Sequence, residues 1–225
     1  MFYDPTFLLL IPAIILAVYA QIRVQTTYAK FSQVRTAKGM SASSIARELL
    51  DNADLRGIEI ELIPGNLTDH YDPRSKKLRL SEGVYNSASV AAMGIVAHEV
   101  GHALQDSKAY APLAIRNGLV PVANFGSQLA IPLFFLGLIF SWPRLMDIGI
   151  IAFSLAVVFT VITLPVEYNA SSRAMAILKS GNYLNTEELD LAKKVLNAAS
   201  LTYVAATAMA ILQLLRLLAL RSRRD

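Results

Sequence analysis

The chain has 225 residues, of which 54% are hydrophobic and 17% charged, with no cysteine and a net charge of +4. Because about a quarter of the residues of a soluble domain are usually charged, this composition favours a membrane protein with a modest folded domain. The lack of cysteine excludes disulfides and thiolate metal sites. The basic residues cluster beside apolar stretches and form no stripe of alternating basic and aromatic residues, which favours charge that flanks a membrane over a nucleic-acid interface.

The first apolar segment is residues 7–20, which together with Phe2 and Tyr3 approach the ~20 residues of a membrane-spanning helix. A signal peptide is the alternative, but the preceding MFYDPT has no basic residue and contains Asp4. We therefore expect residues 1–22 to be an uncleaved transmembrane anchor. The basic residues that follow have no acid among them, which predicts that this side of the membrane is cytoplasmic. They are Arg23, Lys30, Arg35 and Lys38.

Residues 23–117 have the patterns of a small α+β domain. MSASSIARELLDNADLRG has a helical apolar period, with serines to cap its start and Gly57 to end it. IEIEL (58–62) alternates apolar and polar residues, and KLRLS (77–81) is a second short strand. The segments PGNLTD and DPRSK between them are typical of turns.

A helix expected over residues 87–105 carries HEVGH. His98 and His102 are four residues apart, so both lie on one helix face and can reach one Zn²⁺. Glu99 then projects beside the metal, where a carboxylate can take a proton from bound water and pass it to a leaving amine. The motif H-E-x-x-H lies on an amphipathic helix, which is the context that its chemistry requires. The sequence therefore indicates a zinc hydrolase site.

Gly101, inside this motif, costs the helix about 1 kcal/mol relative to alanine. We expect it to keep a groove open beside the metal, which favours a functional site over a packing helix. The alternative is that His98 and His102 are hydrogen-bonded polar groups on a half-buried helix.

Two further apolar segments, residues 119–140 and 148–164, are joined by SWPRLMD, with Trp142 at the expected membrane interface. Proline and polar residues interrupt the first of them. We expect residues 118–166 to form a transmembrane hairpin, which returns the chain to the side that it left.

The last apolar segment is residues 201–220, within a C-terminal region, residues 201–225, that ends in the basic tail RSRRD. If this segment spans the membrane, its terminal arginines lie opposite the basic segment 23–38, against the positive-inside trend. An interfacial or protein-packed helix is the alternative.

A catalytic zinc needs a third protein ligand and an open position for water. His70 lies upstream in a turn-rich segment, and Asp106 follows His102 by only four residues. Glu167 comes directly after the hairpin, on the side of the motif helix, so it is the favoured ligand. Pro165 can redirect the chain there, and residues 167–200 then form the third-ligand helix and the helical remainder of the domain. The alternative for Glu167 is a carboxylate favoured by a helix N-terminus.

Other polar residues near these positions are candidates for supporting roles. Ser171 shares a helix face with Glu167 and could bond to a metal ligand. His70 could stabilise an oxyanion or bind substrate, although an exposed turn histidine is the simpler interpretation. Arg173 could orient a carboxylate or a substrate carbonyl, or lie on a solvated helix face.

AHEVGHALQ followed by PVEYNASSRA resembles the bacterial membrane zinc metallopeptidases known as YugP-like neutral zinc proteases, and the likeness covers nearly the whole chain. More distantly, the chain is similar to the HtpX-type heat-shock proteases and the CAAX prenyl proteases. Those are membrane gluzincins with H-E-x-x-H, a transmembrane hairpin and E-x-x-x-D. The resemblance implies that His98, His102 and Glu167 hold one Zn²⁺ per chain, with Glu99 as general base.

The chain departs from the wider group at Ser171, where that group has aspartate. Asn169 is therefore a second candidate for the hydrogen bond to a ligand histidine. The resemblance also implies that KLRLS is an edge strand that pairs with extended substrate.

The sequence thus predicts a mainly α membrane protein with three to four transmembrane helices and a small α+β zincin-like (gluzincin) domain with a short β-sheet. We expect a multi-pass protein of a bacterial cell membrane with its catalytic domain in the cytoplasm. It would hydrolyse protein or peptide substrates, membrane or juxtamembrane ones above all. A zinc-binding membrane chaperone or scaffold without turnover is the alternative. A transporter is less expected, because residues 7–20 and 148–164 contain no ionisable group.

Overall fold

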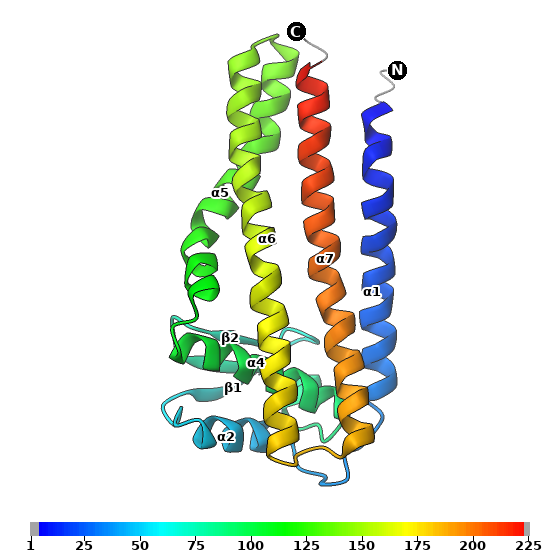
Figure 1. The fold of residues 1–225 in the computed structure, drawn as a ribbon, viewed down its shortest axis with the longest axis vertical. Helices are drawn as coiled ribbons and strands as arrows, with labels where there is room; N and C mark the ends of the chain where they lie inside the picture. The colour runs from blue at the N-terminus through cyan, green and yellow to red at the C-terminus, as the bar shows by residue number, and fades with distance from the viewer. Residues whose placement is uncertain (1–4, 223–225) are drawn as a thin grey trace. The chain divides into compact units, whose positions relative to one another are not determined.

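The computed structural model describes residues 5–222, and Figure 1 traces its elements in chain order. These residues form seven α-helices, one 3-10 helix and a three-stranded sheet. The chain divides into one unit of Met1–Gln21, Ala114–Pro165 and Leu201–Asp225, and a second of Ile22–Leu113 and Val166–Ser200. Phe2, Tyr3 and Asp4 of the expected anchor, and residues 223–225 of the basic tail, lie outside the described residues.

Four helices of the described residues are long and apolar enough to cross a membrane. They are Pro5–Phe31, which joins η1 (Pro5–Leu10) to α1 (Ile11–Phe31), then α5 (Ala111–Ile139), α6 (Pro143–Ser180) and α7 (Thr186–Ser222). Only 11–28% of the most apolar window of each helix is buried, so most of their apolar surface faces outward, as it does in helices solvated by lipid. The chain is a mainly α membrane protein with a small sheet, which confirms the predicted fold class.

Within the first unit, α5 and the first part of α6 pack as an antiparallel hairpin. A Cβ at Gly137 would lie 2.7 Å from the Met146 nitrogen, and one at Gly149 would lie 2.8 Å from the Ala130 oxygen. Only glycine permits such close approach of two helix backbones. Phe134, which is fully buried, fills the space beside this contact.

The prolines of these helices do not interrupt them. Pro121 and Pro132 lie inside α5, and Pro165 lies inside α6. Proline removes one helical hydrogen bond, but membrane helices tolerate this loss. α6 therefore continues through Pro165, where a new helix was expected to start. Glu167 lies within a continuous helix, which excludes the interpretation of this carboxylate as a helix N-terminal residue.

The C-terminal segment 201–220 is the second part of α7, a single helix that starts at Thr186. Its Leu217 is fully buried, and Arg221 donates to Asp147 of α6 at 2.8 Å. This part of α7 therefore packs against protein within the first unit, and its crossing of the membrane stays a prediction.

The second unit contains the sheet, in the order β1-β3-β2. β1 (Glu59–Ile63) is parallel to β3 (Lys77–Ser81), and β2 (His70–Asp72) is antiparallel to β3. The two predicted strands are present, but β2 lies in a segment that was expected to be a turn. KLRLS is the central strand, so its assignment as an edge strand is wrong, and β2 takes an edge.

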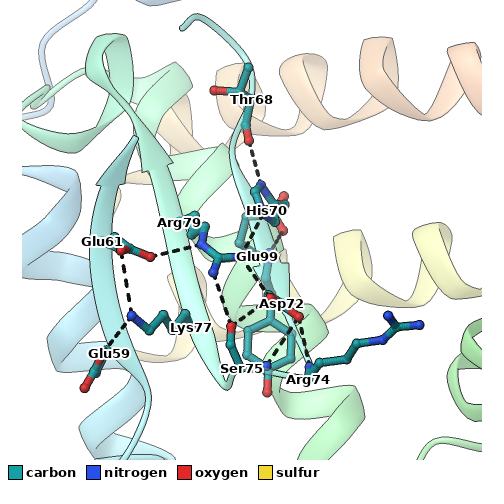
Figure 2. Close-up of polar contacts among 11 residues, drawn as sticks. Glu59, Glu61, Thr68, His70, Asp72, Arg74, Ser75, Lys77, Arg79 and Glu99 are labelled. Carbon is teal, nitrogen blue, oxygen red and sulfur yellow. Dashed lines mark hydrogen bonds and ion pairs between the residues drawn. The ribbon is translucent and has the colours of Figure 1, made fainter. Parts of the chain in front are cut away.

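Charged side chains tie the three strands together (Figure 2). Arg79 of the central strand bridges Glu61 of β1 at 3.0 Å and Asp72 of β2 at 2.9 Å. On the opposite face of β3, Leu78 and Leu80 are fully buried in the core. The sheet therefore presents one charged face and one apolar face, as its alternating sequence requires.

The helices of the second unit begin where the sequence provides caps. The Ser41 side chain accepts from the Ser44 nitrogen at the start of α2 (Ala42–Asn52). The Ser89 side chain does the same for Ala92 at the start of α4 (Val90–Ser107), which follows the short α3 (Glu82–Tyr85). α2 ends before the expected stop at Gly57, and α4 matches the predicted motif helix closely. Most of α4 is buried, so the motif is held within the core of this unit.

Candidate metal centre

Two helices of the second unit bring three side chains together. His98 and His102 of α4 and Glu167 of α6 have ligand atoms within 4.8 Å of one another. Glu167 Oε2 lies 3.2 Å from His98 Nε2 and 3.6 Å from His102 Nε2. Glu167 is only 2% exposed, and a buried carboxylate requires a partner of positive charge. A shared cation at this point would supply that charge.

The spacing of these atoms agrees with one zinc ion. Ligands about 2.0–2.1 Å from a tetrahedral zinc are roughly 3.3 Å apart. The two measured separations, 3.2 and 3.6 Å, lie on either side of that value. Two imidazoles and one carboxylate are also a set that catalytic zinc takes, with the fourth position open. The residues present therefore fit the metal.

The other nitrogen of each imidazole is hydrogen-bonded, as in metal-binding histidines generally. His98 Nδ1 lies 3.1 Å from the Ser171 hydroxyl, and His102 Nδ1 lies 2.9 Å from Gln105 Oε1. The Gln105 amide nitrogen donates to the Val166 carbonyl, which fixes the orientation of the amide. Since Gln105 Oε1 can only accept, His102 carries its proton on Nδ1 and keeps a lone pair on Nε2 for a metal.

Gln105 was not among the predicted residues. It is fully buried, and its amide nitrogen also donates to Asn169 Oδ1 at 3.0 Å. A signal was present, because a residue three positions after His102 lies next to it on the helix. Among the described residues, Asn169 bonds to Gln105 and Arg173, so its proposed bond to a ligand histidine is wrong.

The remaining candidates lie away from the ligand atoms. Arg173 donates from Nε to Asn169 at 2.7 Å, and its guanidinium lies over the ring of Tyr110. It therefore supports the chain of bonds that ends at His102. His70 is the first residue of β2, is exposed, and has Nδ1 2.8 Å from the Thr68 carbonyl (Figure 2).

Glu99 lies beside the cluster on α4. It is buried, and its Oε2 accepts from the backbone N–H of Tyr71 at 2.9 Å. Burial raises the pKa of the Glu99 carboxyl above its ordinary value, and the neighbouring histidines offset only part of this effect. A raised pKa of this kind suits a group that accepts a proton and later donates it.

Gly101 has a different role from the one expected. A Cβ at this position would lie 2.6 Å from the carbonyl oxygen of Ala170 on α6. The absent side chain does not open a groove; it lets α4 and α6 approach closely. This approach places Glu167 next to the histidines, so Gly101 shapes the site through helix packing.

Two histidines and a buried glutamate on packed helices, with a second glutamate beside them, form a candidate metal site on an H-E-x-x-H helix in a mainly α membrane fold. The chain belongs to the family described as "Putative neutral zinc metallopeptidase", whose profile matches residues 6–222.

The chain is also 44% identical over 208 residues to the "Putative membrane protease YugP" of Bacillus subtilis, a match that covers 92% of each chain. No solved structure is matched. These findings confirm the predicted family and support a role as a zinc protease of the membrane.

Proposed function

We propose that this protein is a membrane-anchored zinc endopeptidase whose metal is held by His98, His102 and Glu167. The convergence of these three ligand atoms on one point carries the proposal. Zinc bound there would polarise a peptide carbonyl and lower the pKa of water. Family membership and the membrane protease relative support the same class of reaction.

Glu99 supplies the proton transfers. Its carboxylate takes a proton from water as the water oxygen bonds to the peptide carbonyl carbon. It then gives that proton to the amine nitrogen as the C–N bond breaks. The position of Glu99 on α4, one residue from His98 and held by the Tyr71 N–H, supports this role.

The position of β2 suggests how a substrate would lie. β2 is an edge strand, and the Tyr71 N–H reaches Glu99, so this edge passes directly beside the catalytic group. We expect an extended peptide to lie along β2, in the mode first assigned to KLRLS, without using the Tyr71 N–H, which Glu99 holds. This edge is short, which favours substrates that are also held elsewhere, as a membrane protein is held in the bilayer.

The proposal includes membrane or juxtamembrane substrates, because the helix that carries Glu167 begins in the expected hairpin. Cleavage of a panel of membrane proteins should be faster than cleavage of soluble casein. Equal rates on the two kinds of substrate would remove this preference.

We further propose a multi-pass topology with the second unit in the cytoplasm, as the basic residues of 23–38 predict. Because the chain has no cysteine, Lys194→Cys creates a single thiol at an exposed position of that unit. A membrane-impermeant maleimide should label it only after the cells are opened. Labelling of intact cells would place this unit outside the cytoplasm.

Glu99→Gln tests the reaction itself. The amide keeps the size of the side chain and an acceptor for Tyr71, but it cannot shuttle a proton. Hydrolysis should fall at least ~100-fold, since a positioned general base contributes about 10²–10⁴-fold. Zinc content should stay at the wild-type level. Undiminished biological activity of this variant would instead support the chaperone or scaffold.

A further inference from the structure

A single tyrosine connects β2 to α4 at two points. The Tyr71 N–H donates to Glu99 Oε2 at 2.9 Å, and the Tyr71 hydroxyl donates to Asp106 Oδ2 at 2.7 Å. Glu99 and Asp106 are seven residues apart, so they share one face of α4 about 10 Å apart along its axis. Tyr71 spans this distance, with its backbone at one carboxylate and its phenol at the other.

We propose that Tyr71 is a positioning residue for the general base. Its N–H holds one oxygen of Glu99, so that the other oxygen faces the reacting atoms. Its phenol, held by Asp106, keeps that N–H in place. The inference rests on the proposed function, because it assigns Tyr71 a part in the proton transfers of Glu99. A glutamate has three rotatable side-chain bonds, and a fixed oxygen restricts them before substrate arrives.

The Tyr71 N–H is available for this role because of the strand register. Tyr71 lies opposite Leu78 in the antiparallel pair of β2 and β3. In such a pair, residues alternate between those that bond to the partner strand and those that turn their N–H away. Since the Tyr71 N–H goes to Glu99, Tyr71 is of the second kind. The bond to Glu99 therefore costs the sheet no hydrogen bond.

The end of Tyr71 that is remote from Glu99 is anchored by charge. Asp106 accepts from the Lys76 ammonium as well as from the Tyr71 hydroxyl. Lys76 lies in the turn between β2 and β3, and Asp72 orders that turn by accepting from the Arg74 nitrogen and the Ser75 hydroxyl (Figure 2). Both strand and turn are thus fixed to the helix that carries Glu99, and Asp106 acts as an anchor instead of a metal ligand.

Tyr71→Phe removes only the hydroxyl and so releases the anchor. We expect kcat to fall about ten-fold, part of the ~100-fold or more that a positioned base contributes, with KM and zinc content close to wild type. Tyr183→Phe is the matched control: Tyr183 is also buried, and its hydroxyl donates to the Glu48 carboxylate at 2.9 Å. It should lose comparable stability and keep kcat. An equal loss of kcat in both variants would overturn the proposal.

A second pair of variants tests the connection to Asp106. Asp106→Asn keeps an acceptor for the phenol and should retain most of kcat, whereas Asp106→Leu should resemble Tyr71→Phe. The double variant Tyr71→Phe with Asp106→Leu should be no slower than either single one, because both break the same bond. Multiplied effects in the double variant would contradict the inference.

Hydrogen exchange of the residue 71 amide tests the inference without any reaction. Since this N–H is protected by Glu99, Tyr71→Phe should make its exchange about ten-fold faster, and Tyr183→Phe should leave it unchanged. Unaltered exchange in Tyr71→Phe would refute the positioning role, whatever the enzyme cleaves. A wild-type protein that cleaves no peptide would refute the proposed function, and the exchange result would still decide the role of Tyr71.

Discussion

Gly101→Ala should weaken zinc binding although it changes no residue of the site. The new Cβ would lie 2.6 Å from the Ala170 carbonyl oxygen, 3.2 Å from its carbonyl carbon and 3.3 Å from its Cα. All three are backbone atoms of α6, so no side-chain rotation relieves the overlap. The two helices must separate or tilt to admit one methyl group.

The size of this movement follows from the contact. Ordinary van der Waals contact begins near 3.4 Å, so Ala170 must move by about 0.8 Å. Ala170 lies between Glu167 and Ser171 on α6, and both of these residues contact His98. A shift of this size exceeds the tolerance of about 0.2 Å for metal–ligand distances. We expect zinc affinity to fall at least ten-fold, and overpacking to cost about 1–3 kcal/mol of stability.

Gly94→Ala is the matched control on the same helix. A Cβ at Gly94 would lie 3.5 Å from the Ala192 carbonyl oxygen, which is ordinary contact. This variant should keep its zinc affinity and gain up to about 1 kcal/mol from helix propensity. Zinc titration against a competing chelator, with thermal unfolding of the same samples in detergent, measures both effects. If Gly101→Ala binds zinc as tightly as Gly94→Ala, helix approach does not set the geometry of the site.

Three further outcomes are expected. Gln105→Leu should lower the zinc affinity about 10- to 100-fold in chelator competition, because it removes the hydrogen-bond acceptor of His102 Nδ1. An unchanged affinity would contradict this. Ser171→Ala should lower the zinc affinity by a smaller factor than Gln105→Leu does. Ser171→Asp should bind zinc at least as tightly as wild type, as the aspartate of the wider group predicts; weaker zinc binding by Ser171→Asp would refute this expectation. Burial raises the pKa of Glu99 in the folded state above its ordinary value of about 4.5. The contribution of protonated Glu99 to the free energy of unfolding is therefore complete below about pH 4.5, and it is lost as pH rises through the folded-state pKa. Without metal, Glu99→Gln should therefore lose less thermal stability than wild type as pH rises above about 4.5; parallel curves would exclude the shift.

Structural features that neighbouring residues determine were predictable from the sequence. Features that depend on contacts between distant segments were not. His98, Glu99 and His102 follow from one helical period, and the serine caps of α2 and α4 follow from residue type. β2 has only three residues, too few to show alternation, and it exists because it pairs with β3. The sequence of KLRLS does not indicate that this strand has a partner on both sides, because its second partner is β2.

Within the site, Glu167 was predictable from the sequence, whereas the role of Gly101 was not. Glu167 was predicted from chain order, because a hairpin returns the chain to the side that it left, and this logic needs no detail of the helix. Glu167 lies beside the motif helix as predicted, although no new helix starts after Pro165, since a continuous α6 places Glu167 beside α4 equally well. Gly101 could be recognised as a special residue, but not explained.

The structural role of Gly101 depends on Ala170, which lies on another helix. The whole hairpin separates these two residues in the sequence. A small residue can open a groove or admit a backbone, and the sequence around it is the same in both cases. Here the close approach of α4 and α6 brings Glu167, the proposed third ligand, beside His98 and His102. The glycine of the H-E-x-x-H pentapeptide therefore sets part of the geometry that completes the candidate metal site.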